Sequence, residues 1–129
     1  MSTQRALIVD DSDVLRRLIE MCLRPVGFEL AAARSGAEAL EVAASFHPDL
    51  VLLDIGLPDM SGWDVLDGLR ESAIGDDVKV LILSGYEDVH IEARVRGADG
   101  AIVKPFRNDE LRDVAVAMMT APTGEASSS

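Results

Sequence analysis

The apolar run Leu50-Val51-Leu52-Leu53 constrains the fold more than any other stretch of the sequence. Four consecutive apolar residues without polar alternation indicate a strand that is buried on both faces. Such strands are typical of parallel sheets that helices cover on both sides. The run ends in Asp54, and Pro58 and Gly62 follow closely, so the chain turns away there. We therefore expect the Asp54 carboxylate at the open rim where α/β sheets bind their ligands.

Similar short runs recur along the chain, with helical patterns between them. We expect strands at residues 6–9, 28–33, 50–54, 78–83 and 101–103. We expect helices at residues 13–24, 35–46, 61–71 and 87–96, and a final helix after residue 107. This alternation predicts a doubly wound, flavodoxin-like α/β domain, in which a five-stranded parallel sheet carries helices on both faces. The domain would span residues 1–119, and residues 120–129 would be a disordered tail or a truncated linker.

Capping residues support the expected helix starts. Ser12, Ser35, Ser61 and Asn108 stand where a side-chain oxygen can accept a hydrogen bond from the first turn of a helix. The first of these helices would turn one apolar stripe toward the core. That stripe comprises Val14, Leu15, Leu18, Ile19, Cys22 and Leu23.

The pattern of residues 87–96 is ambiguous. Val89, Ile91, Ala93 and Val95 alternate with polar residues, which is the period of a strand. We nevertheless predict a helix, because two neighbouring parallel strands need a crossover between them. Its poor helical stripe indicates a marginal and mobile helix.

The charge balance argues against direct binding of nucleic acid by this chain. The sequence has 23 acidic and 12 basic residues, a formal net charge of −11, whereas a phosphate backbone requires a basic face. Cys22 is the only cysteine, so no internal disulfide can form. No apolar run approaches the ~20 residues of a membrane span, and no signal-peptide core precedes the first strand. We therefore expect a cytoplasmic protein without membrane contact.

Chemically capable residues stand at the ends of four of the five expected strands. They are Asp10-Asp11, Asp54, Ser84 and Lys104. The strand ends of a parallel sheet share one rim, so these groups can converge. Carboxylates crowded in one site repel each other, and a divalent cation relieves that repulsion; oxygen ligands with room for water suit Mg²⁺. Cation, ammonium and hydroxyl would neutralise and position a phosphoryl group, and a carboxylate could attack it to form an acyl phosphate.

These pieces resemble the receiver domains of two-component response regulators, the CheY-like superfamily. The resemblance covers about residues 5–119 and rests on six segments. They are Val9-Asp10-Asp11, Leu52-Leu53-Asp54, Leu57-Pro58-x-Met60-Ser61-Gly62, Leu83-Ser84-Gly85, Gly97-Ala98-Asp99 and Lys104-Pro105-Phe106. Each segment alone is a weak signal, whereas all six in this order are highly specific.

The resemblance implies that Asp54 is the phosphoacceptor. Ser84 and Lys104 would hold the phosphoryl oxygens, and a cis peptide bond between Lys104 and Pro105 would aim the lysine into the site. The phosphoryl donor would be a phosphohistidine of a histidine kinase or of a histidine phosphotransfer protein. The domain would catalyse only its own phosphorylation and dephosphorylation, and would not otherwise be an enzyme.

The resemblance also implies a Mg²⁺ site. Asp11 and Asp54 would supply side-chain oxygens, and the backbone carbonyl of Gly56 would be the third protein ligand. Asp10 would orient a metal-bound water. The output would pass to a downstream protein partner or to an effector domain of a longer protein; a stand-alone regulator and a fragment are both compatible with the sequence.

One position departs from the family pattern. An aromatic residue that changes rotamer on activation usually stands three positions before the lysine, and here that position is Ala101. Tyr86, two positions after Ser84, could substitute for it, could tune the access of water to the phosphate, or could be a simple exposed side chain.

Two other classes of function are weighed against this interpretation. Asp11-Ser12-Asp13 resembles the Asp-x-Asp signature of haloacid-dehalogenase-type phosphohydrolases, which also use Mg²⁺ and an aspartyl phosphate. Against it, Asp13 suits the first turn of a helix, and the chain has no segment for a cap over a substrate. A non-phosphorylated interaction module on the same scaffold would have no reason to keep an acidic cluster with a lysine.

Overall fold

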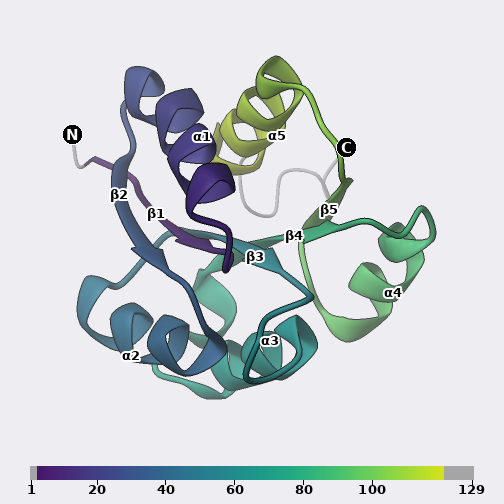
Figure 1. Ribbon diagram of the computed structural model, residues 1–129. Helices are drawn as coiled ribbons and strands as arrows, with labels where there is room; N and C mark the ends of the chain where they lie inside the picture. Colours follow the sequence, from purple (N-terminus) through teal and green to yellow (C-terminus); the bar gives the residue numbers. More distant parts are fainter. Residues whose placement is uncertain (1–2, 121–129) are drawn as a thin grey trace, which may run out of the picture.

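The computed structural model describes residues 3–120, which form one parallel sheet between two layers of helices (Figure 1). The strands are β1 (Arg5–Val9), β2 (Glu29–Ala33), β3 (Leu50–Asp54), β4 (Lys79–Ser84) and β5 (Gly100–Val103). The helices are α1 (Asp13–Leu23), α2 (Gly36–Phe46), α3 (Gly62–Glu71), α4 (Val89–Arg96) and α5 (Asn108–Thr120), with short 3-10 turns at Arg24–Val26 and Gly75–Asp77. The predicted doubly wound α/β fold is confirmed.

The strand order is β2-β1-β3-β4-β5, and every neighbouring pair is parallel. The chain leaves β1 toward one edge of the sheet and leaves β3 toward the other, so these two central strands flank the switch point where such sheets bind ligands. Val9 pairs with Leu53 across them. Asp10, directly after β1, and Asp54, the last residue of β3, therefore reach the rim level with each other.

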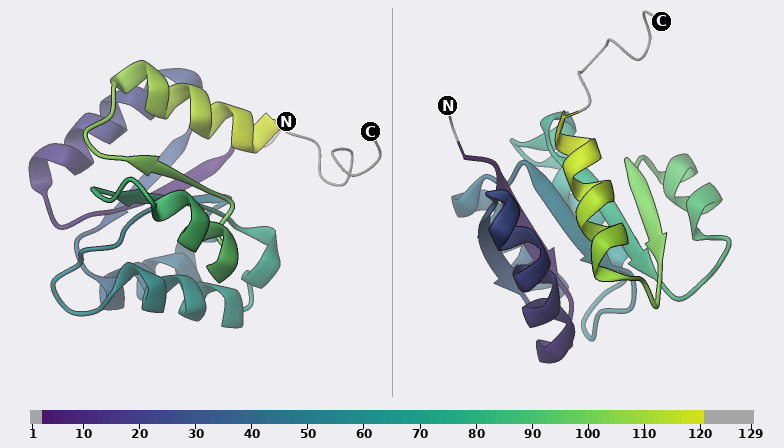
Figure 2. Two further views of the ribbon diagram at one scale, coloured as in Figure 1. Left: turned by 90° about the vertical axis from the view of Figure 1, so that its right-hand side faces the viewer. Right: turned by 90° about the horizontal axis from the view of Figure 1, so that it is seen from above.

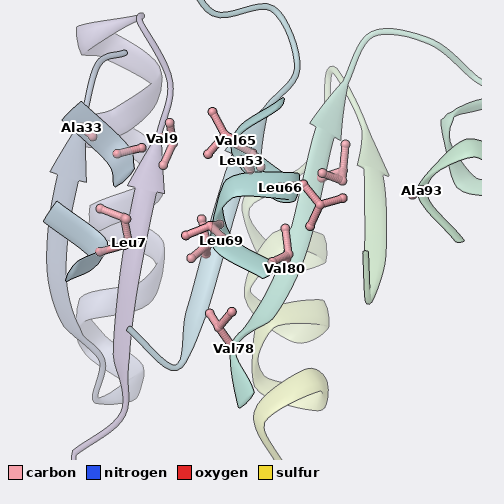
Figure 3. Close-up of a cluster of buried hydrophobic side chains, with 14 of the residues drawn as sticks. Leu7, Val9, Ala33, Leu53, Val65, Leu66, Leu69, Val78, Val80 and Ala93 are labelled. Atoms are coloured by element: carbon pink, nitrogen blue, oxygen red, sulfur yellow. The ribbon is translucent and has the colours of Figure 1, made fainter. Parts of the chain in front are cut away.

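Each face of the sheet has its own hydrophobic core, because successive strand residues point to opposite faces. Figure 3 shows one core, in which Leu7, Val9 and Leu53 pack against Val65 and other residues of α3. The opposite core joins alternate strand residues to α1 and α5, which together cover that face (Figure 2). It includes Ile8, Leu52, Leu81, Ile19, Leu23, Leu111 and Ala115.

Two details of the helices differ from the sequence predictions. Val14 does not belong to the buried stripe of α1, because its side chain is 76% exposed. It follows Asp13 on the outer side of the first turn, while Ile19 and Leu23 are buried. Asn108 is the first residue of α5 and not its cap. The preceding Arg107 has the cap position: its carbonyl accepts from the Leu111 amide at 3.1 Å, and its own amide donates to the Glu110 carboxylate at 3.5 Å.

The ambiguous segment is helical from Val89 onward, as predicted. Val89 and Ala93, four residues apart, are buried against the sheet, whereas Ile91 and Val95 are exposed on the outer side. The strand-like alternation thus arises from two apolar pairs on different sides of one short helix. A helix with only two buried side chains is held weakly, which agrees with its poor stripe.

Serine caps α1, α2 and α3, as expected. The hydroxyl oxygens of Ser12, Ser35 and Ser61 accept from the amides of Leu15, Glu38 and Trp63. Within residues 3–120, no helix has the length and apolar character needed to cross a membrane. Thr120, which the sequence placed in the tail, ends α5, and residues 121–129 lie outside the described part of the chain.

Candidate functional site

The structure brings the predicted residues together at one rim of the sheet. Asp10 follows β1, Asp54 ends β3, Ser84 ends β4 and Lys104 follows β5. Asp10, Asp54 and Ser84 are 1%, 7% and 3% exposed, and no other polar or charged residue in the described chain is as deeply buried. Burial of polar groups is costly unless they are paired. These three side chains therefore need hydrogen-bond or charge partners, either among themselves and their neighbours or in a ligand.

Lys104 joins the two buried carboxylates. Its ammonium Nζ donates to Asp10 Oδ2 at 3.1 Å and to Asp54 Oδ1 at 3.0 Å. The backbone amide of Lys104 donates to the Ser84 carbonyl at 2.6 Å, and this bond holds the Lys104 backbone against the end of β4. The Lys104-Pro105 peptide bond is cis, as the resemblance implied.

Burial and charge act in opposite directions on these groups. Burial raises the pKa of Asp54 and outweighs the hydrogen bond and positive charge of Lys104, which lower it; the nearby Asp10 raises it further. Burial also lowers the pKa of Lys104, but hydrogen bonds and charge from Asp54 and then Asp10 more than compensate, so that its pKa is raised. The lysine therefore stays protonated at neutral pH, whereas burial makes the charged form of Asp54 less favourable.

Three carboxylates form a possible metal site at the same rim. Asp10, Asp11 and Asp54 each offer one oxygen, and these oxygens all lie within 4.8 Å of one another. Asp11 is exposed, whereas the other two are buried. The Gly56 backbone lies beside Asp54, near enough to lower the pKa of its carboxyl slightly. An oxygen-only donor set with an open side suits Mg²⁺, which keeps several waters when few protein ligands are offered.

Ser84 faces the rim but is bonded to its own turn. Its hydroxyl Oγ accepts from the Tyr86 amide at 3.1 Å, so the oxygen is held in place while its hydrogen can still be donated. Tyr86 itself is 75% exposed, and Ala101 is buried. Of the three possibilities for Tyr86, its position agrees with the simple exposed side chain.

Asp13 lies outside this constellation. Its carboxylate is exposed and forms an ion pair with Arg16, one turn further along α1. The Asp-x-Asp interpretation needs this carboxylate in the site, so the haloacid-dehalogenase alternative is not favoured.

The sequence reasoning missed Arg16. Its guanidinium Nη1 donates to the Asp10 carbonyl at 2.6 Å and so holds the backbone at the end of β1. The Asp10 carboxylate in turn accepts from the Ser12 amide at 2.9 Å. An arginine one turn after an aspartate in a helix normally indicates a solvated ion pair, so no signal in the sequence pointed to this support.

Comparison with known proteins agrees with the geometry. Residues 6–116 match the family model described as response regulator receiver domain. The chain is 42% identical over 106 residues to the transcriptional regulatory protein KdpE of Mycobacterium tuberculosis, covering 81% of this chain and 46% of that protein. It is 36% identical over 107 residues to the cell cycle transcriptional regulator CtrA of Caulobacter vibrioides, covering 83% of this chain and 46% of that protein. The chain thus spans less than half the length of these relatives.

Solved structures show the same fold. The chemotaxis response regulator CheY4 of Vibrio cholerae superimposes with a TM-score of 0.83 at 27% identity, over 89% of this chain and 98% of that one. A CheY-like response regulator receiver domain protein from Methanospirillum hungatei gives a TM-score of 0.81 at 27% identity, over 92% of this chain and 94% of that one. The chain therefore belongs to the receiver-domain family of response regulators, which act in two-component signalling.

Proposed function

We propose that this receiver domain accepts a phosphoryl group on Asp54 from a phosphohistidine of a sensor kinase or of a histidine phosphotransfer protein. The observation that carries the proposal is the Lys104 ammonium, which lies within 3.1 Å of both Asp10 and Asp54 at a rim that also holds Asp11 and Ser84. A buried carboxylate whose charged form is disfavoured by burial, and which lies next to a fixed cation, suits the role of a nucleophile toward a phosphoryl group.

In the proposed transfer, a carboxylate oxygen of Asp54 forms a bond to phosphorus while the bond from phosphorus to the donor's imidazole nitrogen breaks. The imidazole leaves with the electron pair of that bond and takes up a proton. Lys104 and the Ser84 hydroxyl would then donate to the phosphoryl oxygens. Asp11, Asp54 and the Gly56 backbone would hold Mg²⁺, whose charge would offset the negative charge of the phosphoryl oxygens.

A mass measurement tests the phosphoacceptor. Incubation with acetyl phosphate and Mg²⁺ should add the mass of one phosphoryl group to the wild-type protein and none to Asp54→Asn. Asp13→Asn, which neutralises an exposed carboxylate outside the site, should be phosphorylated as the wild type is. A phosphate gain that persists in Asp54→Asn would overturn the assignment.

For the output, we propose a shift in the position or mobility of α4. Phosphorylation would draw Ser84 toward the new dianion, and the Ser84 hydroxyl is bonded to the amide of Tyr86, which leads into α4. Val89 and Ala93 are the only buried residues of α4. The helix is also held by the Arg96 guanidinium, which lies 5.1 Å from the centre of the Trp63 ring of α3. Because Ala101 has no aromatic ring to reorient, the change would appear mainly in this helix.

The space around this connection supports such a shift. A cavity of about 530 Å³ lies where α4 begins, and it is lined by Ile55 just after β3, Trp63 of α3, the β4–α4 connection and the first turn of α4. Ile91 and Val95 are exposed on the outer side of α4. The face formed by α4, β5 and α5 would be offered to a downstream protein, or to an effector domain of the same protein.

Backbone NMR with and without beryllofluoride, an aspartyl-phosphate mimic, tests the output. Amide shifts should extend from Asp54 and Ser84 through residues 87–96. Asp54→Asn is the matched control and should show no such shifts. Changes confined to the immediate rim, with residues 87–96 unmoved, would defeat this mechanism.

A further inference from the structure

We propose that Asp59 is a positioning residue for the metal site, because its carboxylate ties the loop that carries Gly56 to the N-terminus of α2. The inference rests on the proposed function, since it takes the Gly56 backbone as part of the Mg²⁺ site. Asp59 would not ligate the metal itself; it stands outside the strand ends and is exposed.

The tie consists of two hydrogen bonds from a distant part of the chain. Asp59 Oδ1 accepts from the Gly36 amide at 2.8 Å, and Oδ2 accepts from the Ala37 amide at 3.0 Å. These two bonds lower the pKa of the Asp59 carboxyl, so it is ionised at neutral pH. Gly36 and Ala37 are the first residues of α2, where backbone amides lack partners within the helix and the dipole favours a negative charge.

A packing contact reinforces the tie. Met60 lies directly on Gly36, and a Cβ added at that glycine would collide with the Met60 side chain. Gly36 is buried, so the absence of a side chain lets the loop sit close to the helix. Two successive loop residues, Asp59 and Met60, are thus anchored to the same residue of α2.

The loop itself is short and internally bonded, so its tip cannot move independently of Gly56. The Gly62 amide donates to the Ile55 carbonyl at 2.8 Å, and the Leu57 amide donates to the same carbonyl at 3.1 Å. Gly56 and Ser61 pair as an antiparallel bridge. The loop of residues 55–62 is thus held at two points: Asp59 bonds its tip to α2, and its first residue follows Asp54 at the end of β3.

The same geometry supplies a matched control. Ser35 caps the same turn of α2 by accepting from the Glu38 amide at 3.2 Å, and Glu38 reaches back to the Arg34 amide at 2.8 Å. Ser35→Ala therefore loosens the start of α2 but leaves the loop attached to it. Asp59→Ala loosens the same turn and also releases the loop. A purely structural role for Asp59 predicts the same outcome for both variants.

The experiment compares Mg²⁺ binding and amide behaviour in the wild type, Asp59→Ala, Asp59→Asn and Ser35→Ala. Asp59→Ala should weaken Mg²⁺ binding about tenfold, the lower end of the loss expected when an outer-shell partner is removed. Ser35→Ala should stay within about twofold of the wild type. Asp59→Asn keeps one acceptor oxygen and should fall between the two. In metal-free protein, the Gly56 amide should shift in Asp59→Ala and not in Ser35→Ala.

Each outcome is decisive. Equal Mg²⁺ affinities for Asp59→Ala and Ser35→Ala, with the Gly56 amide unmoved in both, would overturn the positioning role while leaving the proposed function intact. A wild-type protein that binds no Mg²⁺ would overturn the proposed metal site and this inference with it. A selective tenfold loss in Asp59→Ala, together with the metal-free shift of Gly56, supports both.

Discussion

Replacing Lys104 by Met tests the electrostatics of the rim most directly. Methionine keeps an unbranched apolar stem of similar length and removes only the ammonium, so the loss reports the charge and its hydrogen bonds. In the wild type the ammonium bonds to two carboxylates that are almost fully buried, at 3.1 and 3.0 Å. The substitution leaves both without a counter-charge.

The expected loss of stability follows from that geometry. Removing one partner of a buried ion pair typically costs about 3–5 kcal/mol. The Lys104 side chain is 28% exposed, so water screens the interaction and the lower end, about 3 kcal/mol, is appropriate. For a domain of this size, that loss lowers the Tm by roughly 12 °C. Arg107→Met removes an exposed cation that pairs with Asp109, and it should cost less than about 0.5 kcal/mol.

The pH dependence separates this explanation from simple loss of packing. Lys104 carries its charge throughout pH 5–7, because its pKa is raised. In the variant, Asp54 loses the partner that lowers its pKa, so that pKa rises further. A carboxyl with a raised pKa in the folded state binds protons there first, and the variant's stability therefore increases as the pH falls. The gap between variant and wild type should be largest at pH 7 and narrower at pH 5.

Urea denaturation in metal-free buffer at the two pH values measures the gap. A Lys104→Met protein within about 0.5 kcal/mol of the wild type at pH 7 would refute the reasoning, as would a gap that widens toward pH 5. Equal losses for Lys104→Met and Arg107→Met would show that the two buried hydrogen bonds contribute nothing beyond a surface charge.

Three further predictions concern the same rim. Asp54→Asn should raise the free energy of unfolding of the metal-free protein at pH 7, as measured by urea denaturation. The difference from the wild type should shrink as the pH falls toward the ordinary carboxyl pKa, because a carboxyl with a raised pKa in the folded state lets the wild type gain stability as it takes up a proton. Mg²⁺ at about ten times its dissociation constant should stabilise the wild type by about 1.4 kcal/mol in thermal melts, and Asp11→Ala should reduce that gain; an unchanged wild-type Tm would count against a shared acidic site. Gly62→Ala should cost about 1–3 kcal/mol by urea denaturation, because its Cβ would lie 2.5 Å from the Asp54 carbonyl oxygen, whereas Gly85→Ala meets nothing within 4 Å and should cost less.

Much of the site could be predicted, because local sequence patterns and one rule of topology are enough to place its residues. Each apolar run identified a strand, and the residue at its end identified the chemistry. Since parallel strands share one rim, Asp10, Asp54, Ser84 and Lys104 had to approach each other once the sheet was parallel. No knowledge of side-chain contacts was required for that step.

The errors lie where local patterns cannot decide. Val14 stands at helical spacing with buried residues, but which side of α1 faces the sheet depends on how the helix is docked, and Val14 lies outside the contact. Asn108 is a good capping residue, yet α5 begins at Asn108 itself, with Arg107 before it at the cap position. Arg107 holds that position through its bonds to Leu111 and Glu110, so a good capping residue one position later does not by itself decide where the helix begins.

The sequence by itself determined the fold class and the residues that meet at the rim, because short-range periodicity and strand ends encode them, and the resemblance of six short segments indicated the family. Only the tertiary structure decided how those residues are held. Lys104 reaches Asp10 across 94 positions, and Asp59 reaches Gly36 across 23. An exposed aspartate in a loop has the same local signature whether it is solvated or bonded to a distant helix. The physical reason is that such bonds depend on the packing of helices and loops around the sheet, which no local pattern records.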